Sequence, residues 1–251
     1  ENPIIPLRQI MRWGCRMLDP KIRSLVEKIR DRKLRKKVAD LLNKPSFLIN
    51  GKEYLGVSLE VSPAGLSHHH SYLGGFTEHV VSAGTIALAM CDCVEEVYGG
   101  VVNRDLVVAG ILLHDVFKPL TYKVDEDGYY SSTRLADYLD HSSLIVSELV
   151  RRDFPLELVH IVAAHHGGYG AVRPRTVEAL ICHLADLVDS RLNGDVLNAA
   201  SYLVRRIVGE ELPALSSKEA FEIVHCKAAE GEDGVRKAYR RIVEERKARK
   251  T

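Results

Sequence analysis

LLHDVFKP, residues 112–119, constrains the architecture of this chain more strongly than any other stretch. It closes an apolar run that begins at Leu106, so the pattern predicts a helix over 106–113 that ends before Pro119. An imidazole, a carboxylate and an ammonium follow this apolar turn directly, and such groups are costly beside a core unless they have partners. We therefore expect His114, Asp115 and Lys118 to meet at one polar site.

Further histidines and an aspartate lie within or at the edges of other apolar helical patterns. The chain has eleven histidines, and the polar positions that recur with these patterns are His79, His114, Asp115, His141, His165, His166 and Asp186. Neutral imidazole and carboxylate groups are natural ligands for borderline divalent metals. A single helical His or Asp is more often a cap or a hydrogen-bonded structural residue, so a metal site is predicted only if the helices converge.

Apolar spacing along the rest of the chain predicts an all-α fold. The expected helices are 21–42, a long helix between Gly74-Gly75 and Gly99-Gly100, 106–113, 136–152, 155–165, 176–191, 196–208, 217–229 and 234–248. A small extended arm or hairpin is expected near residues 47–61, with a turn at Asn50-Gly51, and a turn or two-stranded excursion at 125–133. We expect three parts: N-terminal helices and arm (1–62), a core (63–210) and C-terminal helices (211–251).

Composition predicts an ordinary globular protein, with 46% apolar and 27% charged residues. The formal net charge of +1 provides no global field to attract nucleic acid or an acidic membrane. Five scattered cysteines do not form a disulfide framework, which favours a reducing cytoplasm. With no apolar run of about 18 residues, no membrane association is expected. A homo-oligomer remains compatible with the sequence.

Three stretches together resemble the HD superfamily of metal-dependent phosphohydrolases, which has an all-helical fold. They are SHHHSYLGGFTEHVVSA (67–83), LLHDVFKP (112–119) and IVAAHHGGYGAVRPRTVEALICHLADLVDSR (161–191). The resemblance implies an HD-domain helical bundle in which a first metal is bound by His79, His114, Asp115 and Asp186. It also implies that His141 and His165, with His166 as an alternative ligand, bind a second metal, and that Asp115 bridges the two.

Two branches of the superfamily share these stretches, and each implies a different substrate. One branch, which is archaeal, opens the 2′,3′-cyclic phosphate of a pterin during cofactor biosynthesis, and the segment LRKKVADLLNKPSF (34–47) also resembles it. The other is bacterial and trims RNA from its 3′ end. Because no complete OB barrel is evident before the core, the small cyclic phosphate of a pterin or nucleotide is preferred over RNA. A metal- and nucleotide-binding module without turnover is the third alternative.

The ligand types bear on the metal and on the mechanism. A set without cysteine argues against a structural thiolate zinc site, and Fe²⁺ or Mn²⁺ is favoured, with Zn²⁺, Co²⁺ and Ni²⁺ left open. A metal-bound hydroxide would attack phosphorus. Lys118 is expected to contact a phosphate oxygen or the leaving group, and His166 to act as a ligand or a proton donor. The expected substrate contacts are His69, His70 and Arg173.

Overall fold

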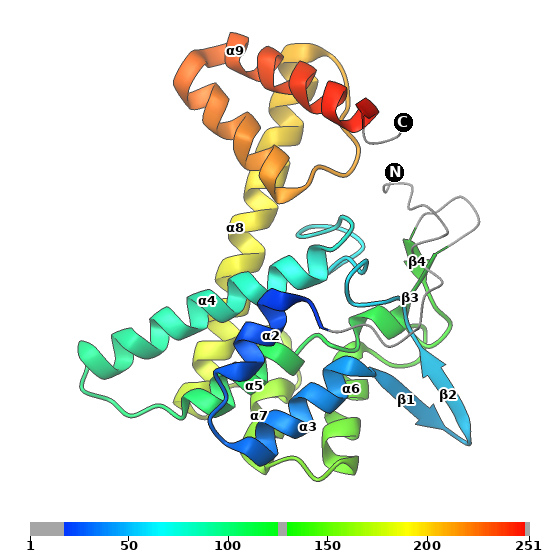
Figure 1. Ribbon diagram of the computed structural model, residues 1–251, viewed down its shortest axis with the longest axis vertical. Coiled ribbons are helices and arrows are strands. Elements are labelled where there is room, and N and C mark those ends of the chain that lie inside the picture. The colour runs from blue at the N-terminus through cyan, green and yellow to red at the C-terminus, as the bar shows by residue number, and fades with distance from the viewer. Residues whose placement is uncertain (1–17, 125–129, 249–251) are drawn as a thin grey trace.

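The computed structural model describes residues 18–124 and 130–248, and helices account for most of it (Figure 1). The helices are α2 (Pro20–Glu27), α3 (Arg32–Asn43), α4 (Gly75–Glu96), α5 (Arg104–Leu113), α6 (His141–Arg151), α7 (Leu156–Ala163), α8 (Val177–Val208) and α9 (Ser217–Ala248). Short 3₁₀ turns, η1 (Lys118–Thr121) and η2 (Gly167–Tyr169), follow α5 and α7. The strands form two antiparallel hairpins, β1 (Ser46–Ile49) with β2 (Lys52–Leu55) and β3 (Tyr122–Val124) with β4 (Tyr130–Ser132). The prediction of an all-α fold with a small hairpin is confirmed.

The prediction of a single helix over 21–42 was wrong in one respect, because two helices, α2 and α3, occupy this range. Asp31 caps α3: its carboxylate accepts hydrogen bonds from the backbone N–H groups of Lys33 and Leu34 at 2.8 and 2.9 Å. The carboxylate of Asp105, at the start of α5, accepts from the backbone N–H groups just before α3. Apolar spacing continues across this break, which is why periodicity alone predicted one helix.

The first hairpin is anchored beside the end of the 112–119 stretch. Asn50 and Gly51 have φ values of 49° and 77° and form its turn, as predicted. The second strand ends at Leu55, six residues earlier than predicted, because the chain then turns toward Pro119. A Cβ atom at Gly56 would lie 2.0 Å from the carbonyl oxygen of Pro119, to which the Val57 N–H donates at 3.1 Å.

One long helix, α8, replaces the two predicted over 176–191 and 196–208 (Figure 1). The predicted break between residues 191 and 196 does not occur: Gly194 continues the helix, and a Cβ atom there would make only an ordinary contact, at 3.5 Å, with the His68 carbonyl oxygen. The kink in α9 lies at Gly231, with φ 68°. It separates two helical segments, in agreement with the two helices predicted over 217–229 and 234–248. The helix predicted to begin at residue 136 begins instead at His141, after the cap Asp140.

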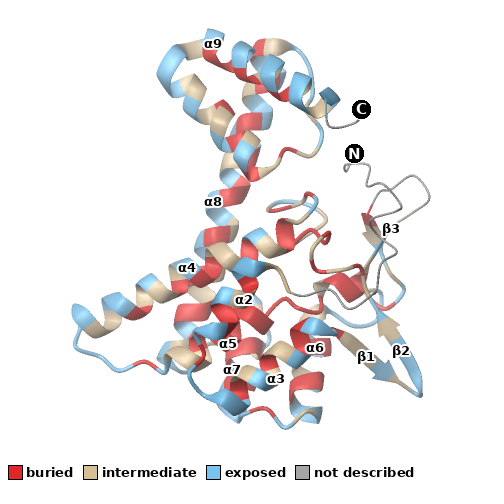
Figure 2. Cartoon of the chain, in the orientation of Figure 1, coloured by how far each residue is buried: buried red, intermediate tan, exposed pale blue. Residues whose placement is uncertain are grey.

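Every residue from 107 to 117 is buried, so the end of α5 and the turn that follows it form the centre of the main core (Figure 2). Helices α4, α7 and α8 contribute Phe76, Ile161 and Cys182 to the apolar clusters around it. A separate apolar cluster joins the end of α8, from Leu197, to α9, and we call these helical segments the C-terminal unit. The division predicted at 62/63 and 210/211 stays a prediction. No helix among the described residues has the length and apolarity needed to cross a membrane.

Candidate metal centre

Five separate elements bring the predicted ligands to one place. His79 lies in the second turn of α4, His114 directly follows α5, and His141 is the first residue of α6. His165 follows α7, and Asp186 lies on α8. The imidazoles of His79, His114 and His165 are almost fully buried, as is the Asp115 carboxylate. The convergence on which the metal prediction depended is therefore present.

One group of atoms gathers around the Nε2 atom of His79. This nitrogen lies 3.1 Å from Nε2 of His114, 3.4 Å from Oδ2 of Asp115 and 3.4 Å from Oδ1 of Asp186. Separations of this size are those of neighbouring ligand atoms around one ion. These are the four residues that the resemblance assigned to a first metal.

A second group gathers around the other oxygen of Asp115. Oδ1 lies 3.1 Å from Nε2 of His141 and 3.8 Å from Nε2 of His165. His166 joins these two histidines in a cluster whose ligand atoms all lie within 4.8 Å of one another. Asp115 thus presents one oxygen to each group, which is the arrangement required of a bridging carboxylate.

The chemistry of these atoms fits a divalent cation. Within residues 18–124 and 130–248, Oδ1 of Asp115 and the Nε2 atoms of His141 and His165 are buried without a hydrogen-bond partner. The other carboxylate oxygen, Oδ2, forms an ion pair with Lys118. Buried polar atoms without partners are rare because each carries a desolvation cost. A shared cation would satisfy these three unpartnered atoms at once, whereas a carboxylate and neutral imidazole acceptors cannot satisfy one another.

The imidazoles are held with Nε2 toward the centre by bonds at their opposite nitrogens. Nδ1 of His114 donates to the carbonyl of Ile111 at 2.8 Å, and Nδ1 of His165 donates to that of Val162 at 2.6 Å. Because a carbonyl only accepts, each ring carries a proton on Nδ1, and Nε2 is the nitrogen that a metal would bind after displacing any proton there. Nδ1 of His79 lies 2.7 Å from Oδ2 of Asp189 and is oriented in the same way.

Sequence reasoning missed Asp189 because the motif used for the metal ligands ends at Asp186. The signal was nonetheless present. Two aspartates three residues apart lie on the same side of a helix, so the spacing placed Asp189 near the predicted ligands.

Comparisons with known proteins agree with this geometry. The HD domain family model matches residues 76–191. The dihydroneopterin 2′,3′-cyclic phosphate phosphodiesterase of Methanocaldococcus jannaschii is 40% identical over 208 residues, which is 83% of this chain and 83% of that protein. This chain belongs to the HD-domain family. It is a metal-dependent phosphohydrolase, as the resemblance implied.

More distant HD-domain relatives match a shorter region. The 3′-5′ exoribonucleases YhaM of Listeria monocytogenes and Bacillus subtilis are each 33% identical, over 142 and 144 residues. The match covers 52% of this chain and 43% of each of those proteins, so the chain spans less than half of their length. No solved structure matches the chain.

We call the cluster of candidate ligands the HD centre; it comprises His79, His114, Asp115, His141, His165 and Asp186. The pKa values of its groups are governed by Asp115 and its neighbours. Burial alone raises the pKa of the Asp115 carboxyl, but Lys118 and His114 outweigh it and hold this pKa well below its usual range. Burial likewise lowers the pKa of His114, but Asp115 and Asp186 raise it to about 10. Burial lowers the pKa of His165 to about 3. The metal-free centre therefore holds an anionic Asp115, a protonated His114 and a neutral His165.

Lys118 is the cation that faces the HD centre directly. Its Nζ lies 2.5 Å from Oδ2 of Asp115, and the side chain is 15% exposed. Although burial lowers the pKa of Lys118, the carboxylates of Asp115 and Asp186 raise it above its ordinary value. The ammonium is therefore charged at neutral pH and is placed beside the bridging carboxylate.

Of the three predicted substrate contacts, the structure brings two to the HD centre. The ring centroids of His69 and His70 lie 5.1 and 5.4 Å from that of His79, and their Nδ1 atoms are 3.2 Å apart. Burial lowers the pKa of His69 to about 4 and that of His70 to about 3, so both rings are neutral at pH 7. Arg173 lies exposed on the loop between η2 and α8, and its guanidinium has no ion-pair partner among the described residues.

Two further histidines, His183 and His160, make structural hydrogen bonds near the candidate ligands. His183, on α8, lies with Nδ1 2.7 Å from the carbonyl of His165 and thereby fixes the backbone of a candidate ligand. Its ring also packs on Gly167, where a Cβ atom would lie 2.3 Å from it and where φ is 57°. His160 accepts a hydrogen bond from the backbone N–H of Arg175 at 3.0 Å, a structural contact.

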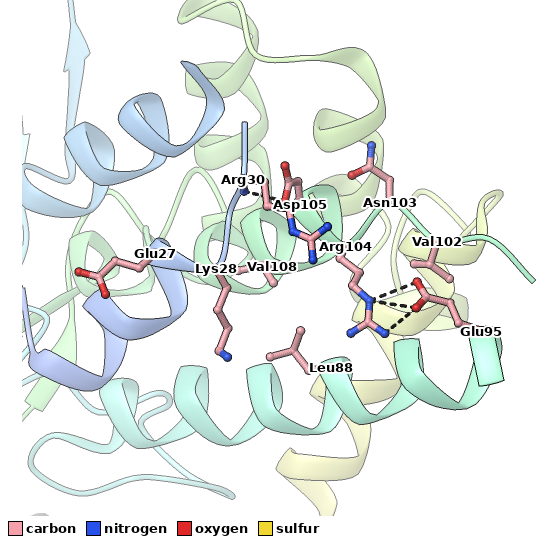
Figure 3. A pocket seen from close by; sticks show the side chains of 10 residues that line it. All are labelled: Glu27, Lys28, Arg30, Leu88, Glu95, Val102, Asn103, Arg104, Asp105 and Val108. Atoms are coloured by element: carbon pink, nitrogen blue, oxygen red, sulfur yellow. Dashed lines mark hydrogen bonds and ion pairs between the residues drawn. The ribbon is translucent and has the colours of Figure 1, made fainter. Parts of the chain in front are cut away.

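A different pocket, of about 670 Å³, lies between α2 and the halves of α4 and α5 remote from the HD centre (Figure 3). Three of its charged side chains, those of Arg104, Glu95 and Asp105, already have partners. Arg104 pairs with Asp92 and Glu95 at 2.6 Å each, and the Asp105 carboxylate is bonded to backbone N–H groups. None of the groups of described His, Cys, Asp and Glu residues that could hold a metal ion lies in this pocket, so it is not a second candidate metal centre.

Proposed function

We propose that this protein hydrolyses the 2′,3′-cyclic phosphate of dihydroneopterin. The observation that carries the proposal is the 40% identity to the Methanocaldococcus jannaschii phosphodiesterase. A match of 208 residues in a chain of 251 necessarily includes residues 76–191, where the candidate ligands lie. The near-neutral chain charge of +1 also suits a small substrate with one phosphate group better than a polymer with many.

The metal assignments are part of this proposal. We assign His79, His114, Asp115 and Asp186 to a first divalent ion and His141 and His165 to a second, with Asp115 shared. Fe²⁺ or Mn²⁺ is preferred for a mixed imidazole and carboxylate set, and Zn²⁺, Co²⁺ and Ni²⁺ are the alternatives. When bound, such ions supply an activated water and neutralise phosphate oxygens. We also propose a cytoplasmic protein of archaeal origin, supported by four free cysteines among the described residues and by the archaeal relative.

The protein groups around the ions have distinct proposed roles. The Lys118 ammonium binds a phosphate oxygen or the leaving oxygen, because it is charged and next to Asp115. His166 is either a ligand or the proton donor to the leaving oxygen. Its ring centroid lies 3.8 Å from that of His165 and 5.1 Å from that of His141, which suits both roles. His69, His70 and Arg173 contact the substrate.

One substrate comparison tests the proposal. Purified protein loaded with Mn²⁺ or Fe²⁺ is incubated with dihydroneopterin 2′,3′-cyclic phosphate, and the monophosphate product is separated by chromatography. We expect the cyclic ester to open, and we expect added chelator to stop the reaction. If the protein hydrolyses other phosphodiesters but not this compound, the proposed substrate is rejected, while the assignment as a phosphohydrolase still holds.

The RNA-trimming alternative is favoured by the YhaM similarity alone. That similarity omits more than half of each exoribonuclease, and an exonuclease needs a basic groove that follows several phosphates. We therefore expect no shortening of 5′-labelled single-stranded RNA in Mn²⁺. Stepwise shortening at a rate above that of the cyclic ester would make RNA the preferred substrate. Tight nucleotide binding without hydrolysis of any phosphoester would instead support a binding module.

A further inference from the structure

The loop before α4 places His69 between two residues in the left-handed backbone region. His68 has φ 79° and His70 has φ 46°. Residues with a Cβ atom adopt this conformation at a steric cost, so it persists only where the surrounding structure imposes it. The strained segment thus coincides with the two histidines that lie against His79, and the contacts that impose it determine where those rings lie.

The side chain of Asn193, on α8, is hydrogen-bonded to the backbone of this segment. Its Oδ1 accepts a hydrogen bond of 2.7 Å from the backbone N–H of His70, and the residue is 5% exposed. The carbonyl oxygen of His70 accepts a hydrogen bond from the Ala64 N–H at 3.1 Å. A Cβ atom at Gly75 would lie only 2.0 Å from this oxygen, so the position requires glycine. Both peptide groups of His70 are therefore hydrogen-bonded, one to Asn193 and one to Ala64, and Gly75 leaves room for the carbonyl.

The other end of the Asn193 amide is bonded to the C-terminal unit. Its Nδ2 donates to the hydroxyl of Ser217, the first residue of α9, at 2.6 Å. The Ser217 hydroxyl is also hydrogen-bonded to that of Tyr72, which belongs to the same loop as His70. Tyr72 is buried in the apolar cluster of the C-terminal unit. The loop with the two histidines is thus tied to α9 both through Asn193 and directly.

The chemistry of this contact requires an amide. One end must accept from a backbone N–H and the other must donate to a hydroxyl, and an asparagine amide does both without charge. An apolar side chain of similar size would fill the space but would leave the His70 N–H buried without a partner. Packing alone therefore does not account for the residue.

We infer that Asn193 is a positioning residue for catalysis, because it holds His69 and His70 against the metal centre and links their placement to α9. The inference rests on the proposed function only for its kinetic readout. It predicts that the C-terminal unit contributes to turnover although none of the proposed ligands belongs to it.

The test compares Asn193→Leu with Asn198→Leu, which changes an exposed asparagine on the same helix. Hydrogen exchange followed by NMR measures the His70 amide directly, without any substrate. Asn193→Leu is expected to speed this exchange at least tenfold while amides within α4 keep their rates. In the Mn²⁺-loaded enzyme we expect kcat to fall by roughly 100-fold, since displacement by about 1 Å can have that effect. Bound Mn²⁺ should match that of the wild type, and Asn198→Leu should change none of these quantities.

Ser217→Ala serves as a milder variant in case Asn193→Leu does not fold. It removes one hydroxyl beside the amide and is expected to shift the His70 exchange and kcat in the same direction by a smaller factor. Adding Asn193→Leu to a variant with both His69→Ala and His70→Ala should slow it no further, because Asn193 acts through these two histidines. Unchanged His70 exchange in Asn193→Leu, or a further loss of kcat in the combined variant, would overturn the inference. If the wild-type protein does not turn over the cyclic ester, the proposed function is rejected. The hydrogen-exchange rate of the His70 amide then decides whether Asn193 holds this loop.

Discussion

The Nδ1 atom of His79 and the Oδ2 atom of Asp189 lie 2.7 Å apart, and both residues are almost completely buried. The carboxylate fixes the tautomer of the imidazole and directs Nε2 toward His114 and Asp186. Because it also increases the basicity of that nitrogen, Asp189 supports metal binding without touching the metal.

Replacement of Asp189 by alanine should therefore weaken metal binding. We expect Mn²⁺ affinity to fall by roughly 10- to 100-fold, the usual cost of losing a carboxylate behind a ligating histidine. Titration of metal-free protein in a calorimeter measures this. Asp195→Ala is the matched control, because Asp195 lies on the same helix in an exposed pair with Arg191. Equal affinities for the two variants would contradict the supporting role.

Asp115 and Lys118 should be separable by measuring metal content and rate together. Asp115→Ala removes the shared carboxylate, so metal and activity should be lost together. Lys118→Ala should retain the metal and lose roughly 10²- to 10³-fold in kcat, as expected for one charged group that stabilises a transition state. Lys123→Ala, an exposed lysine on β3, controls for the loss of a positive charge. Full activity in both site variants would place the reaction elsewhere.

Stability should be sensitive at Gly110, where α5 passes close to α7 and α8. A Cβ atom there would lie 2.5 Å from Cγ2 of Ile161 and 3.1 Å from Sγ of Cys182. Gly110→Ala should therefore lower the free energy of unfolding by about 1–3 kcal/mol through overpacking. Gly168→Ala is the control, since a Cβ atom there meets no atom within 4 Å. Urea denaturation followed by circular dichroism compares the two, and a stability equal to the wild type for Gly110→Ala would refute the close contact.

The C-terminal unit should lose stability in acid through Glu219. Burial raises the pKa of this carboxyl, but its bonds to Arg246 and Ser216 outweigh burial and lower the pKa below its ordinary 4.5. A carboxyl whose pKa is lower in the folded state stabilises the protein above pH 4.5, and that contribution is lost as the pH falls through the folded value.

Urea denaturation between pH 3 and pH 7 checks this dependence. The stability difference between the wild type and Glu219→Gln should be positive at pH 7 and should shrink below about pH 4.5. Glu211→Gln, an exposed carboxyl in the loop before α9, should show no such difference. A wild-type advantage that stays constant down to pH 3 would show that ionisation of Glu219 does not stabilise the fold.

The ligand assignments came from the resemblance and stay a prediction, but the structure brings these residues together, and each lies within or at the edge of an apolar helical pattern. His114 follows a buried helix, as helical periodicity indicated, whereas the helix that begins at His141 was predicted to begin at residue 136. Helical periodicity did not predict that α8 continues past Gly194, because a glycine inside a helical pattern lowers the helix propensity and favoured a division into two helices. Asn193 was missed because its partners, His70 and Ser217, lie far away in the sequence.

The continuity of α8 has a consequence for how the length of this protein can vary. Along this helix, Asp186 faces the other candidate ligands, Asn193 faces the loop that carries His69 and His70, and Val204 packs in the apolar cluster of the C-terminal unit. Each side chain has a set angle around the helix axis. Inserting a single residue after Gly194 would rotate everything beyond it by about 100°. Insertions and deletions here are therefore tolerated only when the number of residues is close to a whole number of helical turns. A module that replaced α9 would have to keep the same orientation around the α8 axis.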